Sequence, residues 1–320
     1  MPLVVVPLAP DELGALTVDE WDRLVACAHV LFERPDHPLV ERLGAAGVAC
    51  GAFDDEPDAT RAGWGLVADP ASPRVLDLAR AGAVVTSGTA RAPDSLSAAH
   101  AAPLVRRAGA SLGALAVVMA RLRSDDGCPW DREQSHASLA RHLLSETYEV
   151  LEAIETGAVG PELEEELGDV LLQVAFHSRL AEQDGRFDLA AVADGIVAKL
   201  LHRHPHVFGD VEVGDAAEVL RNWEAIKAAE KRRADPFEGI PGSLPALVAA
   251  TEAQKRAGAR GFAVDAAAAR RRAAAALERV EPDVGEALFW LVAVARAAGV
   301  DAEAALRAAT RSFRERVASS

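Results

Sequence analysis

The sequence predicts a mainly α protein, in which a small α/β segment precedes an all-α helical bundle. Over residues 108–235, apolar residues recur at helical spacing with few breaks. Over residues 1–105, short apolar runs alternate with amphipathic stretches, which is typical of an α/β unit. We therefore predict three parts: a small α/β remnant with a linker at 1–105, an all-α domain at 106–235 and a further helical unit at 236–320.

The α/β segment is predicted to alternate strands and helices. Apolar runs predict strands over 3–8, 29–33 and 48–53. Thr17, with Glu20 three residues later, predicts a capping box at the start of a helix, and residues 37–47 predict a second helix that ends at glycine. The pattern weakens after residue 60. A stretch rich in proline, serine and alanine between about 90 and 108 predicts a linker.

Residues 108–235 are predicted to be helical throughout. Pro129 breaks the first helix, and Ser135 or Ser138 is expected to cap the next one. Two acidic helices then follow across 139–180. A fourth amphipathic helix leads into a predicted turn, HPHVFGD at 204–210, and residues 215–233 predict a closing helix.

Four acids mark the two acidic helices as a candidate metal site. Glu146 and Glu149 are three residues apart on the first helix, as are Glu166 and Asp169 on the second, so each pair shares a helix face. Each pair flanks an apolar stripe, where unpaired carboxylates repel one another and lose hydration. A hard cation relieves this cost, and oxygen ligands suit Mg²⁺ or Mn²⁺. Other acids of these helices are interpreted as ordinary surface residues: Glu152, Glu155, Glu162 and Glu164.

Composition limits the classes of function. The chain has 320 residues, with 34 Lys and Arg against 49 Asp and Glu, which gives a formal charge of −15. This charge argues against a general nucleic-acid binder. The three cysteines form no CxxC pair, the N-terminus does not resemble a signal peptide, and no apolar run is long enough to span a bilayer. We therefore expect a cytoplasmic protein without nucleic-acid or membrane partners.

Ordered sequence blocks resemble the MazG nucleoside triphosphate pyrophosphohydrolases. The resemblance covers about residues 115–231 and rests on these blocks: GCPWDREQSHASL at 127–139, SETYEVLEAIE at 145–155, EELGDVLLQVAFH at 165–177, RFDL at 186–189, KLLHRHPHVFGD at 199–210 and NWEAIKAAEK at 222–231. The resemblance implies an all-α MazG-like domain, hydrolysis of a nucleoside triphosphate to monophosphate and diphosphate, Mg²⁺ as cofactor and at least a homodimer. Clearing of aberrant nucleotides and control of alarmone levels are both family roles.

The resemblance also implies roles for the acids. The family's metal ligands match Glu146, Glu149, Glu166 and Asp169. A leading glutamate of the first acidic motif is replaced here by Ser145, which spares the ligands but changes their surroundings. Glu165 is a candidate for accepting a proton from the attacking water.

Basic and aromatic residues are candidates for substrate binding. Lys199 and Arg203 are four residues apart on one helix and suit a triphosphate, although a solvated basic face is the alternative for both. Trp223 is expected to stack on a base, as the resemblance implies, and Trp130 is a second candidate; packing in a core is the alternative. Lys227, four residues after Trp223, is expected to reach phosphate or pair with a nearby glutamate. His177, on an apolar helix, is interpreted as a hydrogen-bonded core histidine.

The two ends of the chain are interpreted as structural. The first residues resemble the start of a tetrapyrrole methylase, but PLAPDE replaces the glycine-rich turn after the first strand, so we expect no bound S-adenosylmethionine. Residues 236–320 resemble a second, degenerate MazG module. Its acidic motifs survive only as Asp283 and Glu286, which are too few ligands for Mg²⁺.

Two other functions remain open at this point. A nucleotide or alarmone sensor would keep the metal and the ligand without turnover. A di-iron carboxylate bundle would need Glu-x-x-His motifs, and the sequence has Glu152 and Asp169 at those positions.

Overall fold

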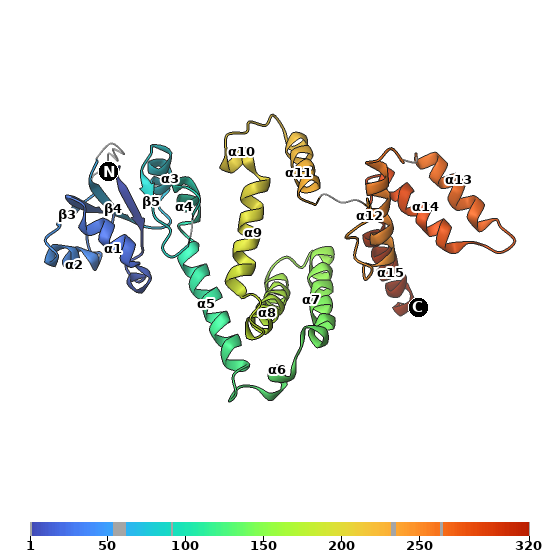
Figure 1. The fold of residues 1–320 in the computed structure, drawn as a ribbon, viewed down its shortest axis with the longest axis horizontal. Coiled ribbons are helices and arrows are strands. Elements are labelled where there is room, and N and C mark those ends of the chain that lie inside the picture. The colour runs from blue at the N-terminus through green and yellow to red at the C-terminus, as the bar shows by residue number, and fades with distance from the viewer. Residues whose placement is uncertain (1, 54–61, 91, 232–234, 263–264, 320) are drawn as a thin grey trace. The chain divides into compact units, whose positions relative to one another are not determined.

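The computed structural model describes residues 2–53, 62–90, 92–231, 235–262 and 265–319 (Figure 1). The chain divides into two compact units, Met1–Val211 and Glu212–Ser320, which are described separately here. Helices dominate both units, and the strands lie near the N-terminus, which confirms the predicted fold class. The three-part division at 105 and 235 stays a prediction.

The N-terminal part is a parallel sheet with helices on both faces. Its strands are β1 (Val4–Pro7), β2 (His29–Phe32), β3 (Ala49–Ala52), β4 (Trp64–Ala68) and β5 (Val84–Val85), in the order β3-β2-β4-β1-β5. The helices between the strands are the 3₁₀ helix Leu13–Ala15, α1 (Val18–Val25), α2 (Leu39–Ala45) and α3 (Pro73–Arg80), and α4 (Ser95–Ala101) follows the last strand. The predicted capping box of Thr17 and Glu20 starts α1.

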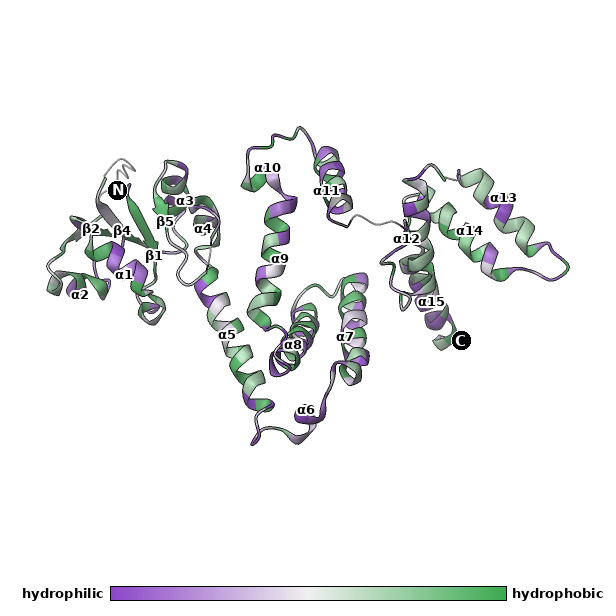
Figure 2. Ribbon diagram, viewed as in Figure 1, coloured by the Kyte–Doolittle hydropathy of each residue, from purple (hydrophilic) through white to green (hydrophobic). Residues whose placement is uncertain are grey.

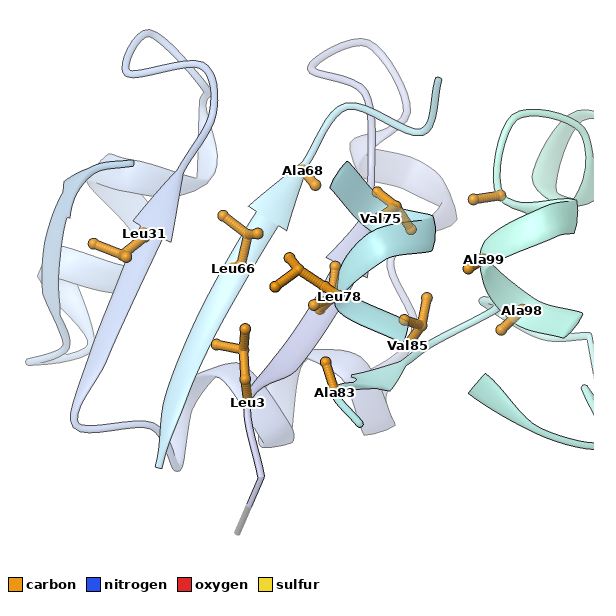
Figure 3. Close-up of a cluster of buried hydrophobic side chains, with 12 residues drawn as sticks. Leu3, Leu31, Leu66, Ala68, Val75, Leu78, Ala83, Val85, Ala98 and Ala99 are labelled. Carbon is orange, nitrogen blue, oxygen red and sulfur yellow. The ribbon is translucent and has the colours of Figure 1, made fainter. Parts of the chain in front are cut away.

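Successive residues of each strand face opposite layers of this sheet. Val5 and Leu66 belong to a core cluster with residues of α3 and α4 (Figure 3). Val4 and Val6 pack on the other face with residues of α1 and α2. Both faces of the central strands are therefore buried, as expected where parallel strands are joined by helices, whereas the edge strand β3 is largely exposed.

Two stretches differ from the sequence prediction. The predicted linker contains α4, where Asp94 accepts a hydrogen bond from the Ser97 backbone N–H and Ala98 and Ala99 are buried in the core. The small alanine side chains, which resemble linker composition, allow this helix to pack closely on the sheet. The predicted turn at 204–210 contains the short helix α10 (Pro205–Phe208), because proline is well placed in the first turn of a helix.

A buried ion pair fastens the following helix to the sheet. Arg106, at the start of α5 (Val105–Leu122), pairs with Glu20 of α1 at 2.6 Å, and the two side chains are 4% and 1% exposed. Arg106 also donates to the backbone carbonyls of Pro7 and Ala15. Burial by itself raises the pKa of Glu20, but hydrogen bonds from Arg106, Thr17 and Thr86 outweigh it and hold this pKa below its ordinary value of 4.5.

The rest of the first unit is helical. Its helices after α5 are α6 (Pro129–Glu133), α7 (His136–Thr156), α8 (Pro161–Gln183), α9 (Leu189–Arg203) and α10. Met119 of α5, Leu139 of α7 and Phe176 of α8 share one buried cluster, so these three helices pack around a common core.

The second unit consists of α11 (Ala216–Lys231), α12 (Ala246–Gly258), α13 (Ala266–Leu277), α14 (Val284–Ala297) and α15 (Ala302–Ala318). The α13 and α14 helices pack along each other, with Ala269, Ala273 and Ala276 buried. Asp283 caps α14, and Arg279 pairs with both Asp283 and Glu286. These contacts support a structural role for the two surviving acids of the degenerate module.

No single helix in the described ranges is both long and apolar enough to cross a membrane; α4 and α5 meet these criteria only as a pair, which is bent by 73°.

Candidate active site

Two long helices position the acids of the candidate site. Ser135 caps α7, because its hydroxyl accepts a hydrogen bond from the Ser138 backbone N–H, and the Ser138 hydroxyl accepts one from Ser135 in return. The α7 helix ends at Gly157, whose φ of 76° suits glycine. A short turn then leads into α8, which begins at Pro161 and packs along α7.

This packing brings three of the predicted ligands together. One carboxylate oxygen from each of Glu146, Glu149 and Glu166 lies within 4.8 Å of the other two. Asp169, one turn beyond Glu166 on α8, is close enough that its charge acts on both Glu146 and Glu166. The cluster therefore combines acids from both helices.

Two acids of the cluster have raised pKa values. Partial burial, and then the negative charges of Glu149 and Asp169, raise the pKa of the Glu146 carboxyl above its ordinary value of 4.5. The same causes raise the pKa of Glu166, with a smaller contribution from Glu165. Such a cluster favours a bound cation, because a divalent charge relieves the repulsion that otherwise promotes protonation.

Ser145 contacts the cluster directly. Its hydroxyl donates a hydrogen bond of 2.9 Å to Glu149 Oε1, one turn along α7. The serine therefore orients a candidate metal ligand from outside the ligand set.

His142 is a neighbour that the sequence analysis did not select. It lies one turn before Glu146, and its charge lowers the pKa of that glutamate against the dominant effects of burial and acidic neighbours. The Trp130 ring meets the His142 ring edge-on, with 6.2 Å between the centroids, and Trp130 is 53% exposed. In the sequence, the spacing of four residues between His142 and Glu146 indicates that the two share a helix face. Trp130 contacts His142, and His142 is close enough to Glu146 for its charge to act on that acid.

A histidine pair joins α7 and α8 elsewhere along their contact. The Nδ1 atoms of His136 and His177 are 2.7 Å apart, and the rings stack with centroids 5.0 Å apart. Burial, and then the neighbouring His136, lower the pKa of His177 below its ordinary value of 6.5. His177 is thus hydrogen-bonded, but to a second histidine.

The remaining candidates lie on α8, α9 and α11. Glu165 is exposed on α8, and Lys199 and Arg203 lie one turn apart on α9. Trp223 and Lys227 lie on α11 in the second unit, where the Lys227 ammonium is 4.6 Å from the centre of the Trp223 ring. Their roles toward a substrate stay predictions.

Comparison with known proteins connects this site to a family. A family model described as the MazG nucleotide pyrophosphohydrolase domain matches residues 134–208. The nucleoside triphosphate pyrophosphohydrolase of Escherichia coli K12 is 40% identical over 221 residues, which cover 63% of this chain and 84% of that protein. The chain belongs to the MazG family.

Other relatives carry MazG-type names. The nucleoside triphosphate pyrophosphohydrolase/pyrophosphatase MazG of Thermotoga maritima is 38% identical, over 66% of this chain and 86% of that protein. The nucleoside triphosphate pyrophosphohydrolase of Mycobacterium tuberculosis is 35% identical, over 79% of this chain and 66% of that protein. The crystal structure of a mazG-related protein from Thermotoga maritima is 30% identical, covers 37% of this chain and 97% of that one, and aligns with a TM-score of 0.31. The matched MazG range contains α7 and α8 with their acids.

Proposed function

We propose that this chain hydrolyses nucleoside triphosphates to nucleoside monophosphate and diphosphate in the cytoplasm, with Mg²⁺ or Mn²⁺ held by the acids of α7 and α8. The observation that carries this proposal is the meeting of Glu146, Glu149 and Glu166 within 4.8 Å, inside the part of the chain that matches the MazG model. The donor set consists of carboxylates, which are the ligands that these hard cations prefer.

We assign the residues of the site different roles in the reaction. Glu146, Glu149, Glu166 and Asp169 would hold the cation, and Ser145 keeps Glu149 in position through its hydrogen bond. A bound cation would neutralise phosphate charge and lower the pKa of an attacking water. Glu165 accepts the proton of that water. Water adds to the α-phosphorus, the bond from the α-phosphorus to the bridging oxygen breaks, and diphosphate leaves.

Basic and aromatic residues are proposed to recognise the substrate. Trp130, which contacts His142, offers an exposed ring for a base. Lys199 and Arg203 provide positive charge for the phosphates, and Trp223 with Lys227 provides a second ring and cation. If the wild-type chain binds nucleotide through these residues but releases no product, the alternative function of a nucleotide or alarmone sensor is supported.

A homodimer is part of the proposal. Figure 2 shows hydrophobic stretches in green along α7, α8 and α9. Large apolar side chains of these helices are exposed, and they include Leu144, Ile154, Leu167, Val192, Ile196, Val197 and Leu200. Exposed apolar residues at this density are typical of a surface that another chain covers. A light-scattering mass of twice 33.6 kDa supports the dimer, whereas the mass of a single chain contradicts it.

The activity is tested by diphosphate release. The wild-type chain is incubated with Mg²⁺ and a panel of ribo- and deoxyribonucleoside triphosphates, to which deaminated and oxidised forms are added because we propose a role in clearing aberrant nucleotides. We expect diphosphate and monophosphate in equal amounts. Glu149→Gln and Asp169→Asn should reduce the rate by about 100-fold or more, since each removes a charged ligand. Glu152→Gln, an exposed acid of the same helix outside the proposed ligand set, is the matched control and should leave the rate unchanged.

Three results would contradict the proposal. Release of orthophosphate would indicate attack at another phosphorus. Equal activity with and without a chelator would exclude the metal. Tight nucleotide binding without any product would support the sensor.

A further inference from the structure

The second unit contains a pocket that the proposed reaction does not use. It has a volume of about 660 Å³ and is lined by residues of α12, α13, α14 and the segments that flank α12. This volume is within the usual range for small-molecule sites. Four aromatic residues and two arginines line it: Phe237, Phe262, Phe289, Trp290, Arg272 and Arg296. Among the described residues of the lining, none is acidic.

Backbone contacts hold two of these aromatic rings at the pocket while leaving them exposed. Arg256 donates to the carbonyls of Pro236 and Glu238, which fixes the segment that carries Phe237. The Phe262 backbone N–H donates to Ala257 at 3.0 Å, directly after Gly261 with its φ of 86°. Phe237 is 46% exposed and Phe262 is 76% exposed. An exposed ring whose backbone is fixed beside a cavity is suited to stack on a flat ligand.

The arginines give the pocket a positive charge. The Arg272 guanidinium lies 4.4 Å from the centre of the Trp290 ring. A guanidinium that lies over an aromatic ring can still donate hydrogen bonds in its own plane. Arg296 Nη1 is 3.4 Å from Gln254 Oε1, which orients the second guanidinium. Two arginines without a carboxylate in the lining favour an anion.

Small residues complete the lining and give a flat ligand access to the helices. They are Ala253, Ala257, Gly258, Ala293 and Ala297. The pocket lining therefore combines aromatic rings, small residues and two positively charged side chains.

We propose that this pocket binds a nucleoside monophosphate, with the base against the aromatic residues and the phosphate at Arg272 and Arg296. The preference for a flat ring that carries an anionic group follows from the pocket alone. The choice of a nucleotide rests on the proposed function, because the proposed reaction releases this class of molecule.

The test is calorimetric titration of the full chain with AMP, GMP and UMP in EDTA. Adenosine and ribose 5-phosphate are the matched probes, because each lacks one half of the ligand. We expect at least one monophosphate to bind at least about tenfold more tightly than either probe. Arg272→Gln and Phe262→Ala should each weaken binding by about tenfold or more, since the first removes a charged contact and the second a stacking contact.

A control variant separates this site from the acidic cluster. Glu149→Gln should leave monophosphate binding in EDTA unchanged, whether or not the chain releases diphosphate, so the two proposals can fail independently. Thermal melts establish that each variant is folded. If Arg272→Gln is unfolded, Phe262→Ala decides, because that side chain is largely exposed. Absence of binding overturns the proposal. It is also overturned by binding that Phe262→Ala leaves unchanged, or by binding that only Glu149→Gln removes.

Discussion

Replacing Arg106 with methionine should destabilise the first unit by about 3–5 kcal/mol, because removing one partner of a buried ion pair leaves the other charge without compensation. Arg106 donates to Glu20 at 2.6 Å, to the Ala15 carbonyl at 2.7 Å and to the Pro7 carbonyl at 3.0 Å. Methionine keeps much of the apolar volume of the arginine side chain. The loss of stability therefore measures mainly the polar contacts of Arg106. Glu20 retains hydrogen bonds from Thr17 and Thr86, which places the expected loss toward the lower end of this range.

Urea unfolding followed by tryptophan fluorescence measures this loss, since Trp21 and Trp64 both pack in the α/β part. The double variant Arg106→Met with Glu20→Gln should lose less stability than the sum of the losses of the two single variants, by at least about 1 kcal/mol. The reason is that the double variant leaves no unpaired charge buried. Arg23→Met is the control: its pair with Asp19 is exposed and is expected to contribute about 0–1 kcal/mol. A loss below about 1 kcal/mol for Arg106→Met, or strictly additive losses, would refute this reasoning.

Three further predictions concern the helical part. Ser145→Ala should weaken Mg²⁺ binding by about tenfold, because Glu149 loses an orienting hydrogen bond; calorimetry with Mg²⁺ checks this, and unchanged affinity would exclude the orienting role. Folding lowers the pKa of His177 below 6.5, so the unfolded chain binds more protons at this residue between the two pKa values. The contribution of His177 to stability should therefore fall as the pH decreases from about 6.5 toward the folded pKa and change no further below it. Urea midpoints across this range should therefore fall, and His177→Gln should flatten the profile. Gly127→Ala should cost about 1–3 kcal/mol, because the added Cβ would collide with the backbone carbonyls of Arg121 and Leu122; an unchanged melting temperature would contradict this.

Much of the local structure followed from the sequence. The capping box of Thr17 and Glu20 was predicted, and Ser135 was one of the two caps predicted for α7, because each depends on residues within one helical turn. The stretch at 95–101 was assigned wrongly as a linker, since its alanines gain their role only from packing against the sheet. Composition alone does not distinguish a linker from a closely packed alanine-rich helix.

For the acidic cluster, helical periodicity determined which acids share a face of each helix, and the tertiary structure determined which of them meet. Glu146 and Glu166 come together because the turn after Gly157 folds α8 back along α7. His142 of α7 meets Trp130 of α6, and this contact also depends on how separate helices pack. The pair of Glu20 and Arg106, 86 residues apart, and the pocket between α12, α13 and α14 had no local signal. Capping and periodicity depend on neighbours within a few residues, whereas these contacts depend on how separate elements pack, and only the folded chain decides that.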